Sequence, residues 1–206
     1  MPAKNSVKQF VENGYYHLYN RGVEKRDIFL DEQDYAVFLS YIKQYLDLSG
    51  SDPHPLANDI RLLAFCLMPN HFHLLAKQSS INGITKLMRA ISTNYVMYFN
   101  KKYERVGTLF QGKYKAAQVD NDSYLLHLSR YIHLNPYPGS DPKYYNYSSY
   151  KYYLGTRNAS WIKTEEILDY FKTAKRVGAK DYLSYESFIE DYKMDSAELL
   201  GNLTLE

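Results

Sequence analysis

The octapeptide Met68-Pro69-Asn70-His71-Phe72-His73-Leu74-Leu75 directly follows the apolar run 62–67. Two apolar stretches of strand length on either side of Pro69 predict two consecutive β-strands, which we place at 60–68 and 70–77. Side chains two residues apart share one face of a strand, so His71 and His73 project together, while Phe72 and Leu74 take the opposite face. The apolar face can therefore enter the core and leave both imidazoles for another task.

The two imidazoles suggest a metal site. Along an extended strand their attachment points are about 6 to 7 Å apart, so both rings can turn toward one ion. Neutral imidazole is the commonest metal ligand in proteins. A single His-x-His pair is nevertheless more often two hydrogen-bonded or solvent-facing histidines. The rest of the sequence has to decide between these interpretations.

Strands and helices alternate through most of the chain. Alternating and helical apolar spacings predict strands over 15–21, 60–68, 70–77 and 113–119 and helices over 32–48, 84–98 and 123–135. Asp120, Asn121, Asp122 and Ser123 are good helix-capping residues, and Pro136 disfavours helix at Asn135, so they bound the last of these helices. The short, hairpin-like connections favour an α+β fold with an antiparallel sheet and helices packed on one face.

The length of 206 residues and the 45% hydrophobic content fit one globular domain with an appendage. We expect a domain over 1–155 and an acidic helical extension over 156–206, with helices near 164–175 and 183–193. No apolar run approaches the roughly 18 to 20 residues that span a bilayer, and the N-terminus does not resemble a signal peptide. The single Cys66 has no disulfide partner, so we expect a cytoplasmic protein with no membrane association.

The net charge of +2 hides an asymmetry between a basic middle region and an acidic end. Aromatic rings alternate with the basic residues of the middle region and could stack on unpaired bases, although such rings also serve as core residues. This composition favours nucleic-acid binding by the middle region. The candidate backbone contacts are Arg89, Lys101, Lys102, Arg105, Lys113 and Lys115.

On the predicted helix 123–135, His127, Tyr131 and Asn135 follow one another at four-residue spacing and form one strip. A phenol and an amide one turn apart could face a common neighbour. Tyr131 could equally be a half-buried core ring and Asn135 a helix cap. Spacing alone does not single out Tyr131 among 23 tyrosines.

Four segments carry a resemblance to a known family. They are Tyr16-His17-Leu18-Tyr19-Asn20-Arg21-Gly22, Cys66 to Leu75, Tyr98-Phe99-Asn100 with Gly107 to Lys115, and Arg130-Tyr131-Ile132-His133-Leu134-Asn135-Pro136. In this order they resemble the single-tyrosine HUH transposases of the IS200-like superfamily, in particular the branch associated with repetitive extragenic palindromes (REP). The resemblance covers about residues 15 to 155.

The resemblance implies a ferredoxin-like, RRM-like sheet with His71 and His73 as metal ligands on a central strand. It also implies that Tyr131 is the nucleophile and that Asn135 completes the metal shell. The implied activity is metal-dependent cleavage and transfer of single-stranded or hairpin DNA through a 5′-phosphotyrosine, in DNA transposition or REP hairpin processing. For the metal we expect Mg²⁺ or Mn²⁺, because imidazole, amide and phosphate ligands together suit such ions.

Two other functions fit parts of the sequence. A non-catalytic module could bind single-stranded DNA or RNA on an RRM-like sheet. A metal hydrolase could use His71 and His73 to hold zinc and activate water. Neither explains a motif tyrosine that accompanies the histidine pair. The sequence leaves open whether the protein acts as a monomer or a homodimer.

Overall fold

The computed structural model describes residues 9–49, 54, 56–136, 139–172 and 184–191. In chain order the elements are β1 (Tyr15–Arg21), the 3₁₀ turn η1 (Val23–Lys25), α1 (Glu32–Leu46), α2 (Leu56–Asp59), β2 (Ile60–Met68), β3 (His71–Gln78), α3 (Gly83–Lys102), β4 (Lys115–Val119), α4 (Asp122–Leu134), α5 (Tyr150–Tyr153), α6 (Glu165–Lys172) and α7 (Tyr185–Glu190). The bounds of the strands and of α1 and α4 lie within about two residues of those predicted from the sequence.

The strands form an antiparallel sheet in the order β2-β3-β1-β4. Helix α1 connects β1 to β2, and α3 connects β3 to β4, so each helical connection links strands that are not neighbours. This is the ferredoxin-like topology that the resemblance implied, and the predicted α+β class is confirmed. Strands β3 and β1 occupy the centre of the sheet.

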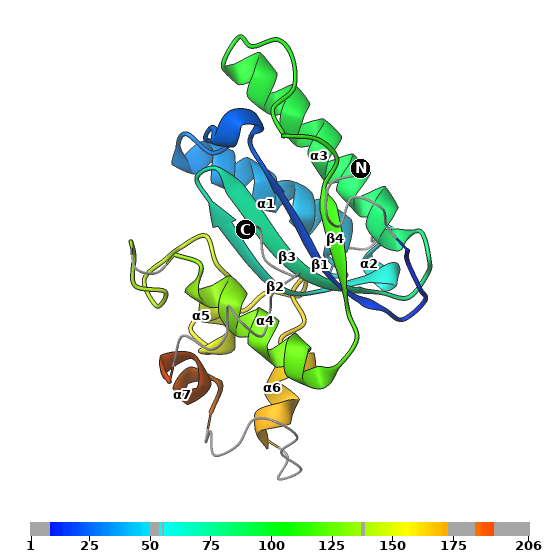
Figure 1. Cartoon of the computed structure of the whole chain (residues 1–206), viewed down its shortest axis with the longest axis vertical. Helices are drawn as coiled ribbons and strands as arrows, with labels where there is room; N and C mark the ends of the chain where they lie inside the picture. Colours follow the sequence, from blue (N-terminus) through cyan, green and yellow to red (C-terminus); the bar gives the residue numbers. More distant parts are fainter. Residues whose placement is uncertain (1–8, 50–53, 55, 137–138, 173–183, 192–206) are drawn as a thin grey trace.

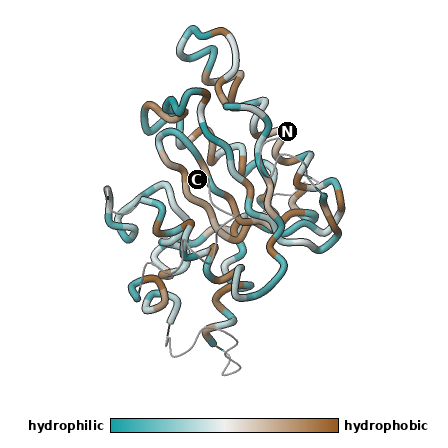
Figure 2. The backbone as a smooth tube through the Cα atoms, viewed as in Figure 1, coloured by the Kyte–Doolittle hydropathy of each residue, from teal (hydrophilic) through white to brown (hydrophobic). Residues whose placement is uncertain are grey.

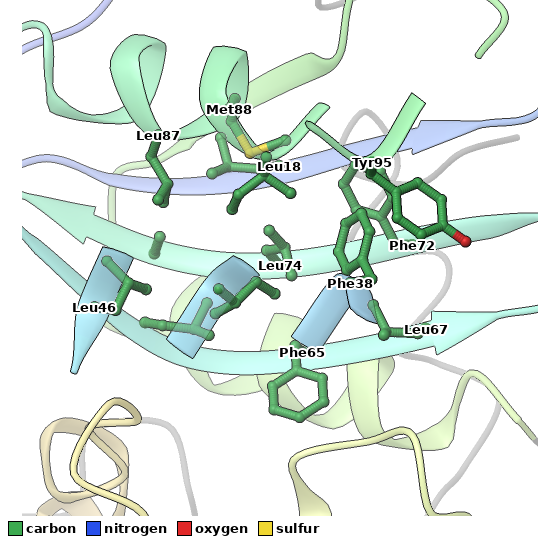
Figure 3. Packing of buried hydrophobic residues seen from close by; sticks show 14 of the residues in the cluster. Leu18, Phe38, Leu46, Phe65, Leu67, Phe72, Leu74, Leu87, Met88 and Tyr95 are labelled. Carbon is green, nitrogen blue, oxygen red and sulfur yellow. The ribbon is translucent and has the colours of Figure 1, made fainter. Parts of the chain in front are cut away.

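Helices α1 and α3 cover one face of the sheet and enclose the larger core (Figures 1 and 3). Phe72 and Leu74 of β3 point into it, opposite to the histidines, and both side chains are fully buried. Burial of each such side chain stabilises the fold by about 1.5 to 3 kcal/mol. Figure 2 shows hydrophobic residues running along β2, as expected for a strand buried on both faces.

The second face of the sheet is also covered by helices. This corrects the expectation from the sequence that the helices pack on one face only. Leu125, Leu128 and Ile132 of α4 pack on residues of β2 and β3 in a separate apolar cluster. Figure 1 shows α4 to α7 grouped together, away from α1 and α3. Strand β2 is apolar on both faces, so it can pack against helices on both sides.

The turn between β2 and β3 is held by its neighbours. The amides of Ile28 and Phe29 both donate to the carbonyl of Pro69, and the amide of Gly22 donates to the carbonyl of Asn70 at 2.8 Å. A Cβ atom at Gly22 would collide with the carbonyl oxygen of Arg26, so only glycine fits at this point. The turn therefore fixes where β3, and with it His71, begins.

Helix α7 packs on α4, and α6 contributes to the same apolar cluster. Ile167 of α6 and Tyr185, Phe188 and Ile189 of α7 join the apolar cluster of the second face. The two helices fall within the predicted ranges 164–175 and 183–193, whose remaining residues 173–175, 183 and 192–193 lie outside the described residues. In the part of the chain that the structure describes, no helix has the length and apolar character needed to span a membrane.

Candidate active site

His71 and His73 lie on the central strand β3 and face α4. Residues directly opposite each other in an antiparallel ladder share a face, and His73 is paired with Tyr19 of β1 and Cys66 of β2. The rings of His71 and His73 are 5.0 Å apart at an angle of 81°. The alternation of the octapeptide thus places both imidazoles on the face that the sequence predicted.

Helix α4 brings Tyr131 and Asn135 to the histidines. Asn121 caps the start of α4, because its side-chain oxygen accepts a hydrogen bond of 2.9 Å from the backbone N–H of Tyr124. Asn135 is the residue that caps the end of the helix. The half-buried Tyr131 ring meets the His73 ring edge to face with centroids 5.4 Å apart. Asn135 Oδ1 lies 3.0 Å from His71 Nε2. The structure therefore gathers the four residues that the resemblance placed in an active site.

His71 is held between two side-chain amides. Its Nδ1 lies 2.6 Å from Asn70 Oδ1, and its Nε2 faces Asn135 Oδ1. Burial lowers the pKa of His71, against the raising effect of Asn135, so the ring is neutral at pH 7 and carries one N–H. If the N–H is on Nδ1 and donates to Asn70 Oδ1, then Nε2 carries a lone pair that lies next to the lone pairs of Asn135 Oδ1. Two ligands of one cation lie next to each other in this way.

His73 is completely buried, with an exposed fraction of 0%. Burial is the main cause that lowers its pKa well below the usual value, and His17 and His71 lower it further. Its Nδ1 lies 2.8 Å from His17 Nε2, while its Nε2 has no hydrogen-bond partner among the described residues. A buried polar atom without a partner is rare and calls for an explanation such as an ion.

These donors fit a divalent cation. Two neutral imidazoles and a carboxamide oxygen suit Mn²⁺ or Mg²⁺, with the remaining positions left to water or phosphate oxygens. No cluster of three His, Cys, Asp or Glu side chains among the described residues could hold a metal. A cation here would therefore depend on Asn135 and on ligands from solvent or substrate, besides His71 and His73.

The predicted DNA contacts are distributed over several parts of the surface. Arg89 of α3 and Lys113, both exposed, line a half-open cavity of about 410 Å³ together with Phe110 and Tyr114. Asn20 of β1 also lines this cavity, and its side-chain amide donates to the carbonyl of Gly112. The cavity therefore combines positive charge with aromatic rings.

The other predicted contacts differ in their surroundings. Lys102 Nζ lies 2.7 Å from Asp31 and 2.8 Å from the buried Asp34, so it takes part in a structural ion-pair network. Lys115 lies above the Tyr19 ring at 5.8 Å. Lys101 is exposed in the last turn of α3, and Arg105 lies 5.7 Å from the Phe99 ring. Lys102 is thus the candidate whose charge is already used within the fold.

Sequence reasoning gave no role to three residues that border the histidines. His17 contacts His73, and Asn70 contacts His71. Arg21 is paired with His71 across β1 and β3, and its charge lowers the pKa of that imidazole. His17 and Arg21 share a face of the alternating strand β1. Their proximity to the histidines depends on the register between β1 and β3.

The chain is similar to known proteins in both sequence and fold. The family model described as "Transposase IS200 like" matches residues 10–135, more than half of the chain. No curated protein matches the sequence. Among solved structures, a REP-associated tyrosine transposase bound to a REP hairpin superposes with a TM-score of 0.57 at 13% identity, over 76% of this chain and 90% of that one. A putative transposase from Deinococcus radiodurans gives a TM-score of 0.39 at 15% identity, over 64% and 95%.

Proposed function

The chain belongs to the family of IS200-like transposases, and on this premise we propose that it is a metal-dependent single-stranded DNA endonuclease and strand transferase with Tyr131 as its nucleophile. The proposal rests mainly on one observation. The helix that follows the last strand lays Tyr131 edge-on against His73, with 5.4 Å between the rings, and Asn135 against His71. A nucleophile and candidate metal ligands come together there from separate elements.

The reaction is a transesterification. Tyr131 Oη bonds to the phosphorus of one phosphodiester and gives its proton to solvent, while the bond from phosphorus to the 3′ oxygen breaks and that oxygen takes up a proton from solvent. The upstream DNA leaves with a 3′-hydroxyl, and the downstream DNA stays on Tyr131 as a 5′-phosphotyrosine. Because the phosphoester bond is retained, the 3′-hydroxyl of another strand can reverse the step and join DNA without ATP.

We assign the metal to His71, His73 and Asn135. A Mg²⁺ or Mn²⁺ ion bound there would draw charge from a non-bridging oxygen of the scissile phosphate. The charge of Arg21, which faces β3 beside His71, favours a phosphate at the same place. The half-buried position of Tyr131 limits the access of water that would hydrolyse the ester.

We propose single-stranded or hairpin DNA as the substrate. The solved relative with the TM-score of 0.57 was bound to a REP hairpin, and DNA transposition or REP hairpin processing is the corresponding task. Arg89 and Lys113 offer positive charge for the DNA backbone, and the half-buried Tyr114 offers a ring beside it. Lys101, Arg105 and Lys115 remain candidates for further backbone contacts, and Lys102 is a weaker one because of its ion pairs.

The polarity of the covalent product tests the proposal. A hairpin oligonucleotide with single-stranded flanks is labelled at either its 3′ or its 5′ end and incubated with the protein and Mn²⁺. On a denaturing gel the 3′ label should move with the protein, whereas the 5′ label should appear in a free fragment. Tyr131→Phe should abolish the protein-linked band, and Tyr124→Phe on the same helix should keep it. Free cleavage by Tyr131→Phe would favour a hydrolase, and DNA binding without cleavage by the wild type would favour a binding module.

A further inference from the structure

His17 lies beside His73 on the neighbouring central strand. In the register of β1 and β3, Tyr19 is opposite His73 and His17 is opposite Leu75, so His17 and His73 share a face in diagonal positions. His17 Nε2 is 2.8 Å from His73 Nδ1, and the two rings stack at 5.0 Å with 24° between their planes. Both side chains have an exposed fraction of 0%. Water therefore does not compete for this hydrogen bond.

The direction of this hydrogen bond decides what His73 can do. A hydrogen bond between two imidazole nitrogens needs one N–H and one lone pair. If His73 Nδ1 carries the hydrogen, His73 Nε2 has a lone pair available for a cation. If His17 carries it, His73 Nε2 bears the hydrogen and cannot bind a metal. His73 Nε2 has no hydrogen-bond partner among the described residues, so it is the nitrogen of this ring that remains for a cation.

We propose that His17 is a positioning residue that accepts the Nδ1–H of His73 and so holds His73 in the tautomer that binds the divalent cation through Nε2. This inference rests on the proposed function, because it concerns the same metal site. A partner that fixes the second nitrogen of a histidine ligand is the usual support of metal sites in proteins. His71 has equivalent support from Asn70 Oδ1, 2.6 Å from its Nδ1.

The partner that we propose for His73 is a neutral imidazole. Such partners are commonly carboxylates, which bring negative charge close to the metal. A neutral imidazole fixes the tautomer and the ring orientation without that charge, so a bound cation keeps its attraction for the phosphate. The rings of His17 and Tyr131 also meet edge to face, with centroids 6.3 Å apart. One side chain thus contacts both a metal ligand and the nucleophile.

Substitutions of similar size separate this role from simple packing. In His17→Gln, Oε1 stands the same number of bonds from Cα as Nε2 of histidine, so it can accept the Nδ1–H of His73. His17→Leu fills a similar volume but has no acceptor. Mn²⁺ affinity of the full-length proteins is measured without DNA, by the electron paramagnetic resonance of free Mn²⁺, and a thermal melt checks that each variant folds.

His17→Leu should weaken Mn²⁺ binding by about 10- to 100-fold, the usual effect of losing such a partner, and His17→Gln should bind close to the wild type. Equal binding by both variants, or equal weakening in both, would overturn the proposal. The ¹⁵N chemical shifts of His73 in the wild type give a second test that needs no variant, because the hydrogen should be on Nδ1; a hydrogen on Nε2 in the metal-bound protein would also overturn it. Both measurements are made without DNA, so they test the role of His17 separately from strand cleavage. An absence of strand cleavage would instead contradict the proposed function.

Discussion

The ring of Tyr131 stands edge-on to the ring of His73, with 5.4 Å between centroids, although the two residues belong to different layers of the fold. His73 is fixed in the central strand of the sheet, and Tyr131 is carried by the helix packed over that strand. The packing of α4 on β2 and β3 therefore sets the distance between a candidate nucleophile and a candidate metal ligand.

Two substitutions of Asn135 should change the affinity for Mn²⁺ in opposite directions. Asn135→Asp places a charged, harder oxygen beside His71 Nε2 and should strengthen Mn²⁺ binding, whereas Asn135→Ala should weaken it. Both can be followed by isothermal titration with Mn²⁺. If Asn135 serves only as the residue at the end of α4, the two variants will bind Mn²⁺ equally well.

Arg89 and Lys102 should differ in their effect on DNA binding. Arg89 is exposed at the cavity beside Lys113, so Arg89→Gln should weaken DNA binding and reduce the slope of log affinity against log salt by about one. Lys102 is paired with Asp31 and Asp34, so Lys102→Met should lower the urea midpoint and leave the salt slope unchanged. Fluorescence anisotropy at several salt concentrations measures both slopes. A reduced slope for Lys102→Met would show that its charge contacts DNA after all.

Protein stability should fall as the pH drops below about 6.5. Burial lowers the pKa of His133 to about 3 in the folded protein, whereas an unfolded histidine has a pKa of about 6.5. Between these values the unfolded chain binds one more proton, so the stability is complete above pH 6.5 and is lost progressively toward pH 3. His133 alone should reduce the free energy of unfolding by about 2 kcal/mol between pH 7 and pH 5. Urea unfolding at several pH values measures this, and a His133 resonance that titrates near pH 6.5 in the folded protein would contradict it.

Tyr185 should couple the C-terminal helix α7 to α4. Its hydroxyl lies 2.7 Å from His133 Nδ1 and 3.0 Å from Ser129 Oγ, both on α4 and both buried. Tyr185→Phe leaves the imidazole N–H without its partner and should cost about 1 to 3 kcal/mol of unfolding free energy. Tyr144→Phe is the matched control, because Tyr144 is largely exposed. Equal urea midpoints for the two variants would show that this contact does not hold α7 in place.

The sequence predicts local features of the site well. The alternation in β3 is enough to place His71 and His73 on one face, and the capping residues before α4 predict where the helix of Tyr131 begins. The nucleophilic role that we propose for Tyr131 is implied only by the resemblance, because spacing does not distinguish one tyrosine from many others. That His71 and Asn135 come to lie together depends on how α4 packs across the sheet, which no local pattern encodes.

Long-range pairing explains what the sequence did not reveal. The contact between His17 and His73 depends on the register of β1 against β3, and the alternating pattern of 15–21 does not distinguish His17 as the partner of a candidate metal ligand. Lys102 belongs to a basic segment, so its charge suggested DNA, but its acidic partners Asp31 and Asp34 come from the start of α1. The apolar residues of β2 allowed helices on one face or on both, and only the packing of α4 decides this.

The most direct test of the central claim is to identify the residue that carries the DNA. The covalent product formed with Mn²⁺ and a hairpin oligonucleotide is trimmed with nuclease, digested with protease and analysed by tandem mass spectrometry. The account predicts a nucleotide attached through its 5′ phosphate to Tyr131, out of 23 tyrosines in the chain. Attachment to another residue, or cleaved DNA with no nucleotide on any peptide, would contradict it.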